Sequence, residues 1–328
     1  MGGGFSSREN TMNQLQKMLL GICVLGTLQA EAAAPMVKTS APGFYRVMLG
    51  DFEITALSDG TVALPVNTLL TNISKGKIDK ALAKSYLSSP LETSVNAYLI
   101  NTGDKLVLVD TGAAGLFGPT LGHFMENLKA AGYQPEQIDE VYITHLHGDH
   151  MGGLMVGEQL AFPNAVLRVD QRDIDFWLSQ ANMDAAPEAM KGFFKGAVAS
   201  IGPWVKAGKL KTFDGNTDLI PGVKSVSTYG HTPGHSIYMV ESRGQKLALW
   251  GDLMHVAAVQ FATPEVTIQF DTDSKSAAKQ RQQAYAEAAK QGYLIGSAHL
   301  SFPGLGHLRK VDKGYSWLPV NYSPMYGK

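Results

Sequence analysis

Short runs of apolar residues, separated by turn-forming residues, recur along most of the chain. Residues 52–64 alternate apolar and polar positions around Asp59-Gly60, and an Asp-Gly pair in that place is typical of a hairpin turn. Residues 94–101 and 105–110 flank Thr102-Gly103-Asp104 and predict a second hairpin. Further strands are expected at residues 141–144, 223–229, 235–241, 246–251 and 292–297.

Two segments have helical spacing instead. Residues 120–131 carry apolar positions at helical intervals and end near Gly132, and residues 274–291 are rich in Ala, Gln and Lys, which predicts a helix packed on the surface. Runs of strands with helices outside them favour the α+β class, as an αββα sandwich of two packed sheets flanked by helices. We expect a single domain over residues 35–328.

The N-terminus has a different pattern. Lys17 is followed by an apolar run at residues 18–28 and then by a segment of mostly small residues at 29–34, which is typical of a secretory signal peptide. A membrane-spanning helix needs about 20 apolar residues, so this run is too short, although a buried core helix is an alternative. We therefore expect residues 1–34 to be removed, with residues 1–11 an upstream extension if Met12 is the true start. The mature protein would be periplasmic or secreted, without a membrane anchor.

Composition excludes several classes of function. Hydrophobic residues make up 45% and charged residues 17%, and the formal net charge is −1. No stripe of Lys and Arg is visible, which argues against nucleic acid or an anionic membrane as a partner. The only cysteine, Cys23, lies in the apolar run, so any metal in the mature chain must bind to His and carboxylate ligands.

The strongest chemical signal is a dense group of metal-ligand residues after the strand expected at 141–144. His145 and His147 project to the same side of extended backbone, Asp149 continues the alternation, and His150 follows as the chain turns. Four ligand-type residues within six positions predict a metal site. The glycines at 148, 152 and 153 are expected to let the backbone wrap closely around it.

Two cations need about seven protein ligands, so further ligands are expected elsewhere. His231, Asp252 and His299 each stand at the end of a predicted strand. Two divalent ions can share a water and lower its pKa towards neutrality, and the bridging hydroxide then attacks a carbonyl or phosphoryl centre. Nitrogen and oxygen ligands favour zinc, with manganese, cobalt and iron left open.

These residues resemble the metallo-β-lactamase superfamily, whose H-x-H-x-D-H motif matches residues 145–150. The resemblance extends over nearly the whole mature chain, including residues 109–112 and 230–235. It implies one metal on His145, His147 and His231, a second on Asp149, His150 and His299, and Asp252 as the bridge between them. It also implies that Asp110 orients a ligand histidine.

Within that superfamily, residues 50–61, 110–118 and 157–165 most resemble secreted methyl parathion hydrolases and their lactonase relatives. The resemblance implies an aromatic substrate pocket at Phe117, Trp177 and Phe193, which suits a small uncharged aryl substrate. Ordinary core packing is the alternative for each of these rings. The same analogy leaves a homodimer open.

Four departures from the pesticide hydrolases bear on the substrate. His255 replaces an apolar residue, Leu69 stands in a loop where those enzymes carry Arg, and Ile268 and Phe270 are bulkier than expected. Our hypothesis is a smaller pocket mouth in which His255 hydrogen-bonds a leaving oxygen, with Asp149, Asp252 and His255 closest to the reaction. This predicts a dihydrocoumarin-type lactonase or aryl esterase with promiscuous organophosphate hydrolysis. The alternatives are a methyl parathion-type triester hydrolase and a non-catalytic metal-binding protein on the same fold.

Overall fold

The structure is a computed structural model that describes residues 1–3 and 34–324. It divides into two units, Met1–Ala41 and Pro42–Lys328, and residues 34–41 contain no helix or strand. Most of the expected signal peptide, including its apolar run at 18–28, lies outside the described residues. Within the described ranges, no helix combines the length and apolarity needed to cross a membrane.

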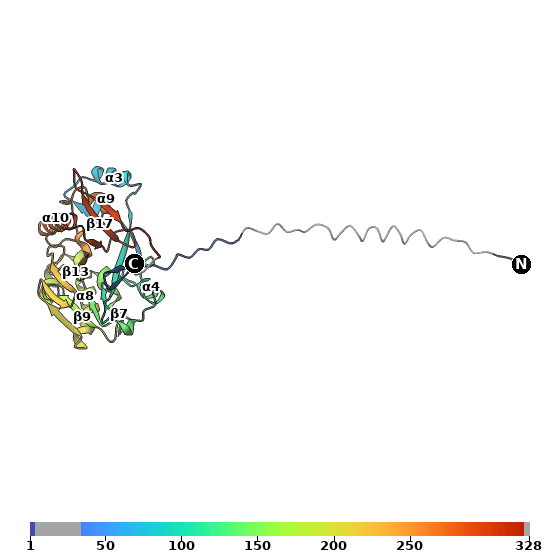
Figure 1. Ribbon diagram of the computed structural model, residues 1–328, viewed down its shortest axis with the longest axis horizontal. Helices are drawn as coiled ribbons and strands as arrows, with labels where there is room; N and C mark the ends of the chain where they lie inside the picture. The colour runs from blue at the N-terminus through green and yellow to red at the C-terminus, as the bar shows by residue number, and fades with distance from the viewer. Residues whose placement is uncertain (4–33, 325–328) are drawn as a thin grey trace. The chain divides into compact units, whose positions relative to one another are not determined.

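The unit Pro42–Lys328 is built on two seven-stranded sheets within its described part (Figure 1). The first sheet has the strand order β1 (Phe44–Leu49), β2 (Phe52–Leu64), β4 (Leu91–Asn101), β5 (Leu106–Val109), β6 (Glu140–Tyr142), β9 (Val166–Asp170) and β10 (Leu210–Phe213). The second has the order β11 (Thr217–Ile220), β12 (Val223–Ser227), β13 (Ser236–Ser242), β14 (Gln245–Leu249), β16 (Leu294–Gly296), β17 (Leu305–Lys310) and β18 (Tyr315–Pro319).

The central strand β5 is apolar at every position, and β4 has an apolar run from Ala97 to Ile100, because both faces of these segments are buried. In β4, Ala97 and Leu99 join a core beneath the helices on the outer face of the first sheet, whereas Tyr98 and Ile100 face the core between the two sheets. Residues from β12, β13 and β14 complete that inner core, for example Tyr238. Alternate residues of one strand thus serve two different cores.

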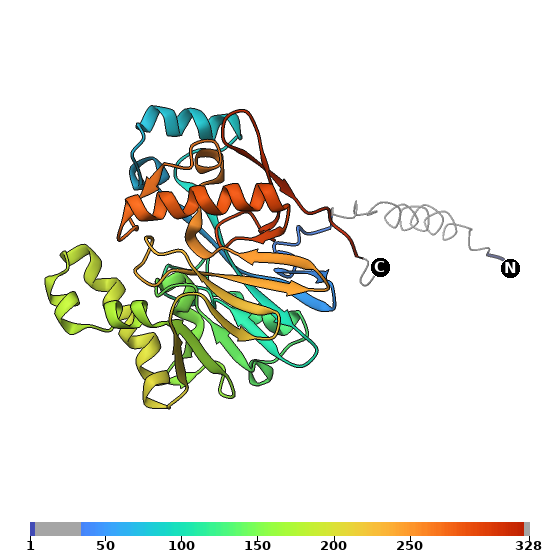
Figure 2. The same cartoon turned by 60° about the vertical axis from the view of Figure 1, so that its left-hand side comes forward.

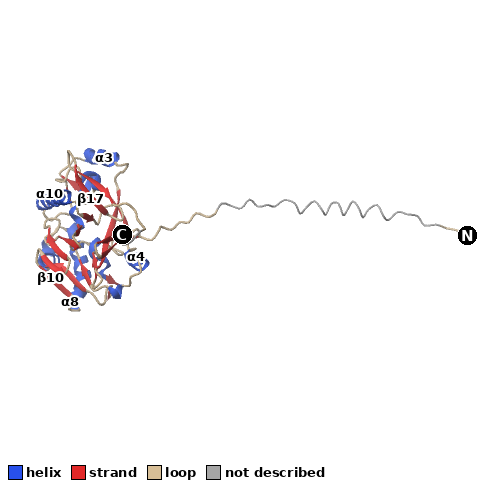
Figure 3. Cartoon of the chain, viewed as in Figure 1, coloured by secondary structure: helices blue, strands red, loops and turns tan. Residues whose placement is uncertain are grey.

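Helices cover the outer faces of both sheets (Figures 2 and 3). The helices α4 (Phe124–Ala130), α6 (Gln171–Trp177) and α8 (Lys191–Lys206) pack on the first sheet, and α10 (Ser274–Gln291) packs on the second. The predicted αββα sandwich is therefore confirmed.

The remaining elements are α2 (Val66–Leu69), β3 (Leu70–Thr71), α3 (Lys75–Lys84), η1 (Pro135–Gln137), α5 (Gly148–Met151), η2 (Gly152–Leu154), β7 (Met155–Val156), β8 (Gln159–Leu160), α7 (Gln180–Ala185), η3 (Glu188–Met190), η4 (Gly251–Leu253), α9 (Ala257–Gln260) and β15 (Thr267–Ile268), where η denotes a 3₁₀ helix.

The predicted helix at 274–291 is confirmed with the same bounds. Asp273 caps its first turn by accepting a hydrogen bond from the Ser276 backbone N–H, and Gly292 ends it in the left-handed conformation at φ 68°. The predicted helix at 120–131 is shorter, since α4 begins at Phe124.

The hairpin expected at 94–110 is confirmed by the antiparallel pairing of β4 with β5. The hairpin expected at 52–64 is wrong, because these residues form one continuous strand with an irregularity between Ser58 and Gly60. The buried Asp59 carboxylate accepts hydrogen bonds from the backbone N–H groups of Ala113 and Phe124. Held by these long-range bonds, the Asp-Gly pair forms a bulge within the strand and does not form a turn.

The sheet topology brings the ends of several strands together at one edge of the sandwich. Strands β5, β6 and β9 run parallel, so the residues after β5 and β6 lie at the same edge of the first sheet. In the second sheet β14 and β16 are also parallel, which places the residues after them side by side. All the predicted metal ligands stand in these segments or in the turn before β13.

Candidate metal centre

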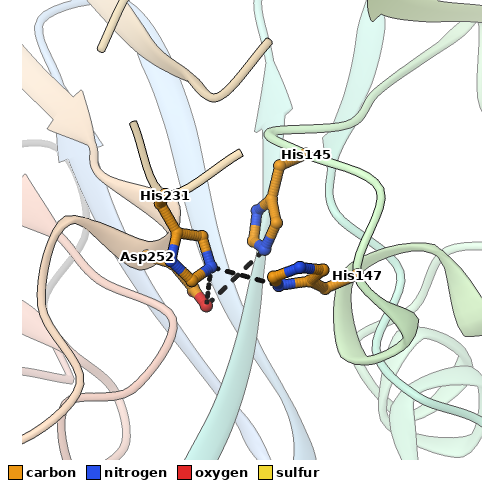
Figure 4. Close-up of side chains that lie close together, drawn as sticks. All are labelled: His145, His147, His231 and Asp252. Carbon is orange, nitrogen blue, oxygen red and sulfur yellow. Dashed lines mark hydrogen bonds and ion pairs between the residues drawn. The ribbon is translucent and has the colours of Figure 1, made fainter. Parts of the chain in front are cut away.

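The first group of ligand-type residues consists of His145, His147, His231 and Asp252, all buried (Figure 4). Their ligand atoms lie within 4.8 Å of one another. The His231 Nε2 atom is 3.1 Å from Nδ1 of His147 and 3.2 Å from Oδ2 of Asp252, and His145 Nε2 is 3.6 Å from the same oxygen. Three imidazole nitrogens and one carboxylate oxygen thus converge on one point.

The second group consists of Asp149, His150, His299 and, again, Asp252. Oδ1 of Asp252 is 3.0 Å from Nε2 of both His150 and His299, and Oδ2 of Asp149 is 3.5–3.6 Å from these two nitrogens. The two oxygens of Asp252 therefore face different groups. The structure brings together all seven predicted ligands, in the two sets that the family resemblance implies, with Asp252 shared.

Local backbone explains why residues 145–150 deliver ligands to both groups. His147 is extended, at φ −86° and ψ 155°, and the short helix α5 starts directly after it. Extended backbone turns His145 and His147 to one side, whereas the helical turn directs Asp149 and His150 towards the second group.

The glycines near this segment are needed for close approach more than for unusual backbone angles. Gly152 has ordinary helical angles, φ −60° and ψ −33°. A Cβ on Gly152 would lie 2.4 Å from the Ala113 carbonyl oxygen, and one on Gly153 would lie 2.1 Å from that of Thr111. These glycines let the segment after the ligands pack directly on the loop that follows β5.

Buried partners fix the ring orientation of three ligand histidines. Nδ1 of His150 lies 2.8 Å from Asp110, Nδ1 of His231 lies 2.8 Å from Asp271, and Nδ1 of His299 lies 2.9 Å from the carbonyl oxygen of Ser94. With Nδ1–H donating outward, Nε2 of each ring points into its group, where it would be the atom that binds a metal. The resemblance implied this role for Asp110, whereas sequence reasoning missed Asp271.

Two further buried residues hold the ligand segments. Nδ1 of His235 bonds the Thr228 hydroxyl at 2.8 Å, and its Nε2 accepts a hydrogen bond from the backbone N–H of Asp252 at 3.0 Å. Burial and the neighbouring His231 lower the pKa of His235 to about 3, so this ring is neutral and available as an acceptor.

Asp173 was also missed by sequence reasoning. Its carboxylate accepts hydrogen bonds from the backbone N–H of Leu146, at 2.9 Å, and of Gly234, at 2.6 Å, and from the Thr232 hydroxyl, at 3.0 Å. Leu146 lies between two ligands, and Thr232 follows another. One buried carboxylate therefore joins the two loops that supply the first group.

The donor set fits two divalent cations. Nε2 of His145, Nε2 of His150 and Oδ1 of Asp252 are buried and form no hydrogen bond within the described residues. Burial by itself would raise the pKa of Asp252, but the surrounding imidazoles hold that pKa well below its usual range, so the carboxylate is ionised. Buried nitrogens and oxygens of this kind, converging without hydrogen-bond partners, are the ligands that zinc and related ions take.

A cavity of about 100 Å³ opens beside both groups. Its lining joins four ligand residues to an apolar wall and consists of Val62, Leu64, Phe117, His147, Asp149, Phe193, Asp252, His255, Phe270 and His299. Of the residues predicted for a substrate pocket, Phe117, Phe193, Phe270 and His255 therefore line the cavity.

The other three predicted pocket residues lie behind that lining. Trp177 is fully buried and packs edge-on against His147, with ring centroids 5.4 Å apart, so it supports a ligand instead of facing the cavity. Ile268 and Leu69 belong to a separate apolar cluster with α3 and α9. In β15, Ile268 pairs with Leu70 of β3, and both of these residues are buried in that cluster, whereas Leu69, at the end of α2, packs against it.

The structure places His255 against the shared carboxylate. Nε2 of His255 is 3.0 Å from Oδ2 of Asp252, and its Nδ1 is buried without a hydrogen bond among the described residues. Burial lowers the pKa of His255, so the neutral ring donates its single N–H to Asp252. In this arrangement His255 orients the shared Asp252 carboxylate and has no free N–H for a leaving oxygen.

The fold and the site define the class of protein. The chain belongs to the metallo-beta-lactamase superfamily, whose family model matches residues 91–289. Among solved structures, hydrolase AbOPH of the beta lactamase superfamily is 37% identical, with a TM-score of 0.83 over 87% of this chain and 100% of that chain. AidC, a dizinc quorum-quenching lactonase solved with the product N-hexanoyl-L-homoserine, is 26% identical, with a TM-score of 0.79 over 86% and 98% of the two chains.

Similarity to lactonases extends to the curated sequences. The N-acyl homoserine lactonase of a Bacillus species is 28% identical over 171 residues, which are 46% of this chain and 60% of that enzyme. The chain thus spans about 60% of the length of this relative. None of these three relatives is described as a methyl parathion hydrolase, so that finer resemblance stays a prediction.

Proposed function

We propose that this chain is a binuclear metal-dependent lactonase acting on small uncharged lactones or aryl esters. The observation that carries the proposal is the position of Asp252. This residue is shared by two groups of buried ligands, and both groups border one apolar cavity. A protein that only stores or senses a metal has no need for two adjoining ligand sets beside a cavity of this kind.

Two divalent ions bound there would lower the pKa of a shared water and stabilise negative charge on a carbonyl oxygen. The protein's own part is to fix the ligands before substrate arrives. His235 holds the Asp252 backbone, His255 holds its carboxylate, and Asp173 joins the loops of the first group. Ligands held in this way need little reorganisation during the reaction.

The cavity wall supports an uncharged substrate. Its apolar members include Phe117, Phe193 and Phe270, and each charged or titratable residue of the lining either belongs to a ligand group or contacts one. The wall therefore offers burial and ring contacts to a lactone, and it has no Lys or Arg side chain that could pair with a free carboxylate. The similarity to lactonases supports the same substrate class, and the three phenylalanines favour an aryl lactone such as dihydrocoumarin.

The test compares kcat/KM of the zinc-loaded enzyme for dihydrocoumarin, an N-acyl homoserine lactone and methyl parathion. We expect a lactone to exceed the phosphotriester by tenfold or more, and dihydrocoumarin to exceed the acyl lactone. A phosphotriester that wins by tenfold would overturn the lactonase assignment in favour of organophosphate hydrolysis. Two bound metals without turnover of any substrate would point to the non-catalytic alternative.

A pair of histidine variants distinguishes the loss of a metal ligand from the general effect of removing a histidine. His145→Ala removes a ligand of the first group and should reduce kcat by at least 100-fold. His123→Ala changes a half-exposed histidine that pairs with Glu126 outside the site, so its activity should stay within twofold of wild type.

We also propose that the chain is exported to the periplasm or secreted, which rests on Lys17 and the apolar run after it. N-terminal sequencing of the protein from a periplasmic or culture fraction should find a start near residue 33–35. An intact N-terminus in the cytoplasmic fraction would refute this.

A further inference from the structure

One segment of the chain touches both the cavity and the first ligand group. It runs from Ile268, at the end of β15, to Asp273, the N-cap of α10. Phe270 lines the cavity, and the next residue, Asp271, places Oδ1 2.8 Å from Nδ1 of His231. Of these two adjacent residues, one thus forms part of the cavity wall and the other contacts a ligand of the first group.

The contact with His231 is reinforced from both sides. The Asp271 side chain has no exposed area, and its other oxygen accepts the Ile268 backbone N–H at 3.1 Å. The backbone N–H groups of Thr272 and Asp273 donate to the carbonyl oxygens of His231, at 2.9 Å, and Gly230, at 2.8 Å. The segment therefore holds both the ring and the backbone of this ligand.

The beginning of the segment is hydrogen-bonded to the short helix α2, which ends at Leu69. The backbone N–H of Gln269 donates to the carbonyl oxygen of Leu69 at 3.0 Å, and the Gln269 side chain donates to that of Thr68 at 2.8 Å. Asp271 is thus the polar link between this segment, which is bonded to α2, and the first ligand group.

Asp271 is also the counterpart of Asp110 in the other group. Asp110 lies 2.8 Å from Nδ1 of His150, and Asp271 lies at the same distance from Nδ1 of His231. A carboxylate on the outer nitrogen fixes the tautomer of a ligand imidazole and raises its basicity. Each ligand group therefore has one buried aspartate that aims one of its histidines.

We propose that Asp271 is a positioning residue with two roles. It directs His231 towards one of the two metals, and it links the cavity-wall residue Phe270 to the same histidine. The inference rests on the two-metal site of the proposed function, but it does not depend on which substrate is used. Loss of Asp271 should weaken one metal and leave the other in place. The position of Phe270 in the cavity wall should also become less fixed, because the adjacent residue no longer bonds His231.

The experiment measures metal binding by Asp271→Ala, Asp271→Asn and wild type. Zinc affinity is obtained by competition with a chromophoric chelator, and the visible spectrum of the cobalt(II) form reports the coordination of each ion. We expect Asp271→Ala to bind one of its two zinc ions about 10- to 100-fold more weakly and the other within threefold of wild type. Asp271→Asn can still accept from Nδ1–H but lacks the charge, so a smaller loss at the same ion is expected.

Asp273→Asn is the matched control. Asp273 lies on the same segment, but its carboxylate bonds Ser276 at the start of α10 and not a ligand. Unchanged zinc affinity in this variant, together with the selective loss in the Asp271 variants, supports the proposal. Equal weakening of both ions in the Asp271 variants would show a general loss of structure and overturn it.

If Asp271→Ala fails to fold, Asp271→Asn carries the test, and two zinc ions bound with wild-type affinity in a folded Asp271→Asn would overturn the proposal. Activity adds a second readout, in which KM for a lactone should rise in the Asp271 variants and stay unchanged in Asp273→Asn. Wild-type enzyme that binds two metals but hydrolyses no lactone would refute the proposed function while leaving the metal-binding test of Asp271 intact.

Discussion

Replacing Gly153 with alanine tests whether close backbone packing holds the second ligand group. An added Cβ would lie 2.1 Å from the carbonyl oxygen of Thr111, whereas ordinary contacts begin near 3.4 Å, so the two segments must separate by about 1.3 Å. Gly153 has no positive φ, and the clash is therefore purely steric. Thr111 and the neighbouring Asp110 both bond His150, through its backbone carbonyl and its Nδ1.

The size of the effect follows from these contacts. Overpacking of a closely packed site typically costs about 1–3 kcal/mol, and losing a hydrogen bond to a charged group costs about 1.5–3 kcal/mol. We therefore expect Gly153→Ala to lower the free energy of unfolding by roughly 3–5 kcal/mol. Because the shift moves Asp110 away from His150, the metal of the second group should bind about 10- to 100-fold more weakly.

Urea denaturation gives the free energy of unfolding, and chelator competition gives the affinity of each metal. The control is Gly202→Ala in the interior of α8, where an added Cβ meets no atom within 4 Å. That variant should be more stable by about 0.5–1 kcal/mol, because alanine restricts the unfolded chain. If Gly153→Ala unfolds within 1 kcal/mol of wild type and keeps both metals, the steric reasoning is refuted.

Three further predictions follow from the site. Removing metal with EDTA should abolish hydrolysis and lower the Tm, and added zinc should restore both; activity that survives chelation would contradict a metal-dependent reaction. In the metal-free protein burial lowers the pKa of His231, but Asp252 and Asp271 outweigh it and raise this pKa to about 9. Because the folded pKa exceeds the unfolded value of about 6.5, this stability is present below pH 6.5 and is lost as the pH rises through 9. The urea midpoint of the EDTA-treated protein should therefore fall between pH 6.5 and 9, and a flat profile would count against it. Phe117→Ala should raise KM for an aryl lactone about 5- to 30-fold, since a ring contact worth about 1–2 kcal/mol is lost, without changing the zinc content.

The candidate metal ligands could be predicted because their signals are local. Residues 145–150 have their ligands at spacings that backbone geometry converts directly into directions, and His231, Asp252 and His299 follow recognisable strands. The sandwich was predictable for a similar reason, since runs of apolar strand residues and one well-capped helix are local patterns.

Other features have no local signal. Asp271 and Asp173 are single acids whose partners lie 40, 27 and 61 residues away, and only the packing of distant loops makes them neighbours of ligand residues. The same holds for the cavity. Phe117, Phe193 and Phe270 face it, whereas Trp177 and Ile268 are turned into the cores behind it by elements that the sequence pattern does not orient.

The sequence by itself determined which atoms are available to bind metal and that strand ends present them. The tertiary structure decided how Asp252 divides its two oxygens, which nitrogen each imidazole directs inward, and which side chains reach the cavity. The physical reason is that ligand identity is a property of single residues at short spacings. Ring orientation and cavity lining instead depend on hydrogen bonds and packing between segments far apart in the chain.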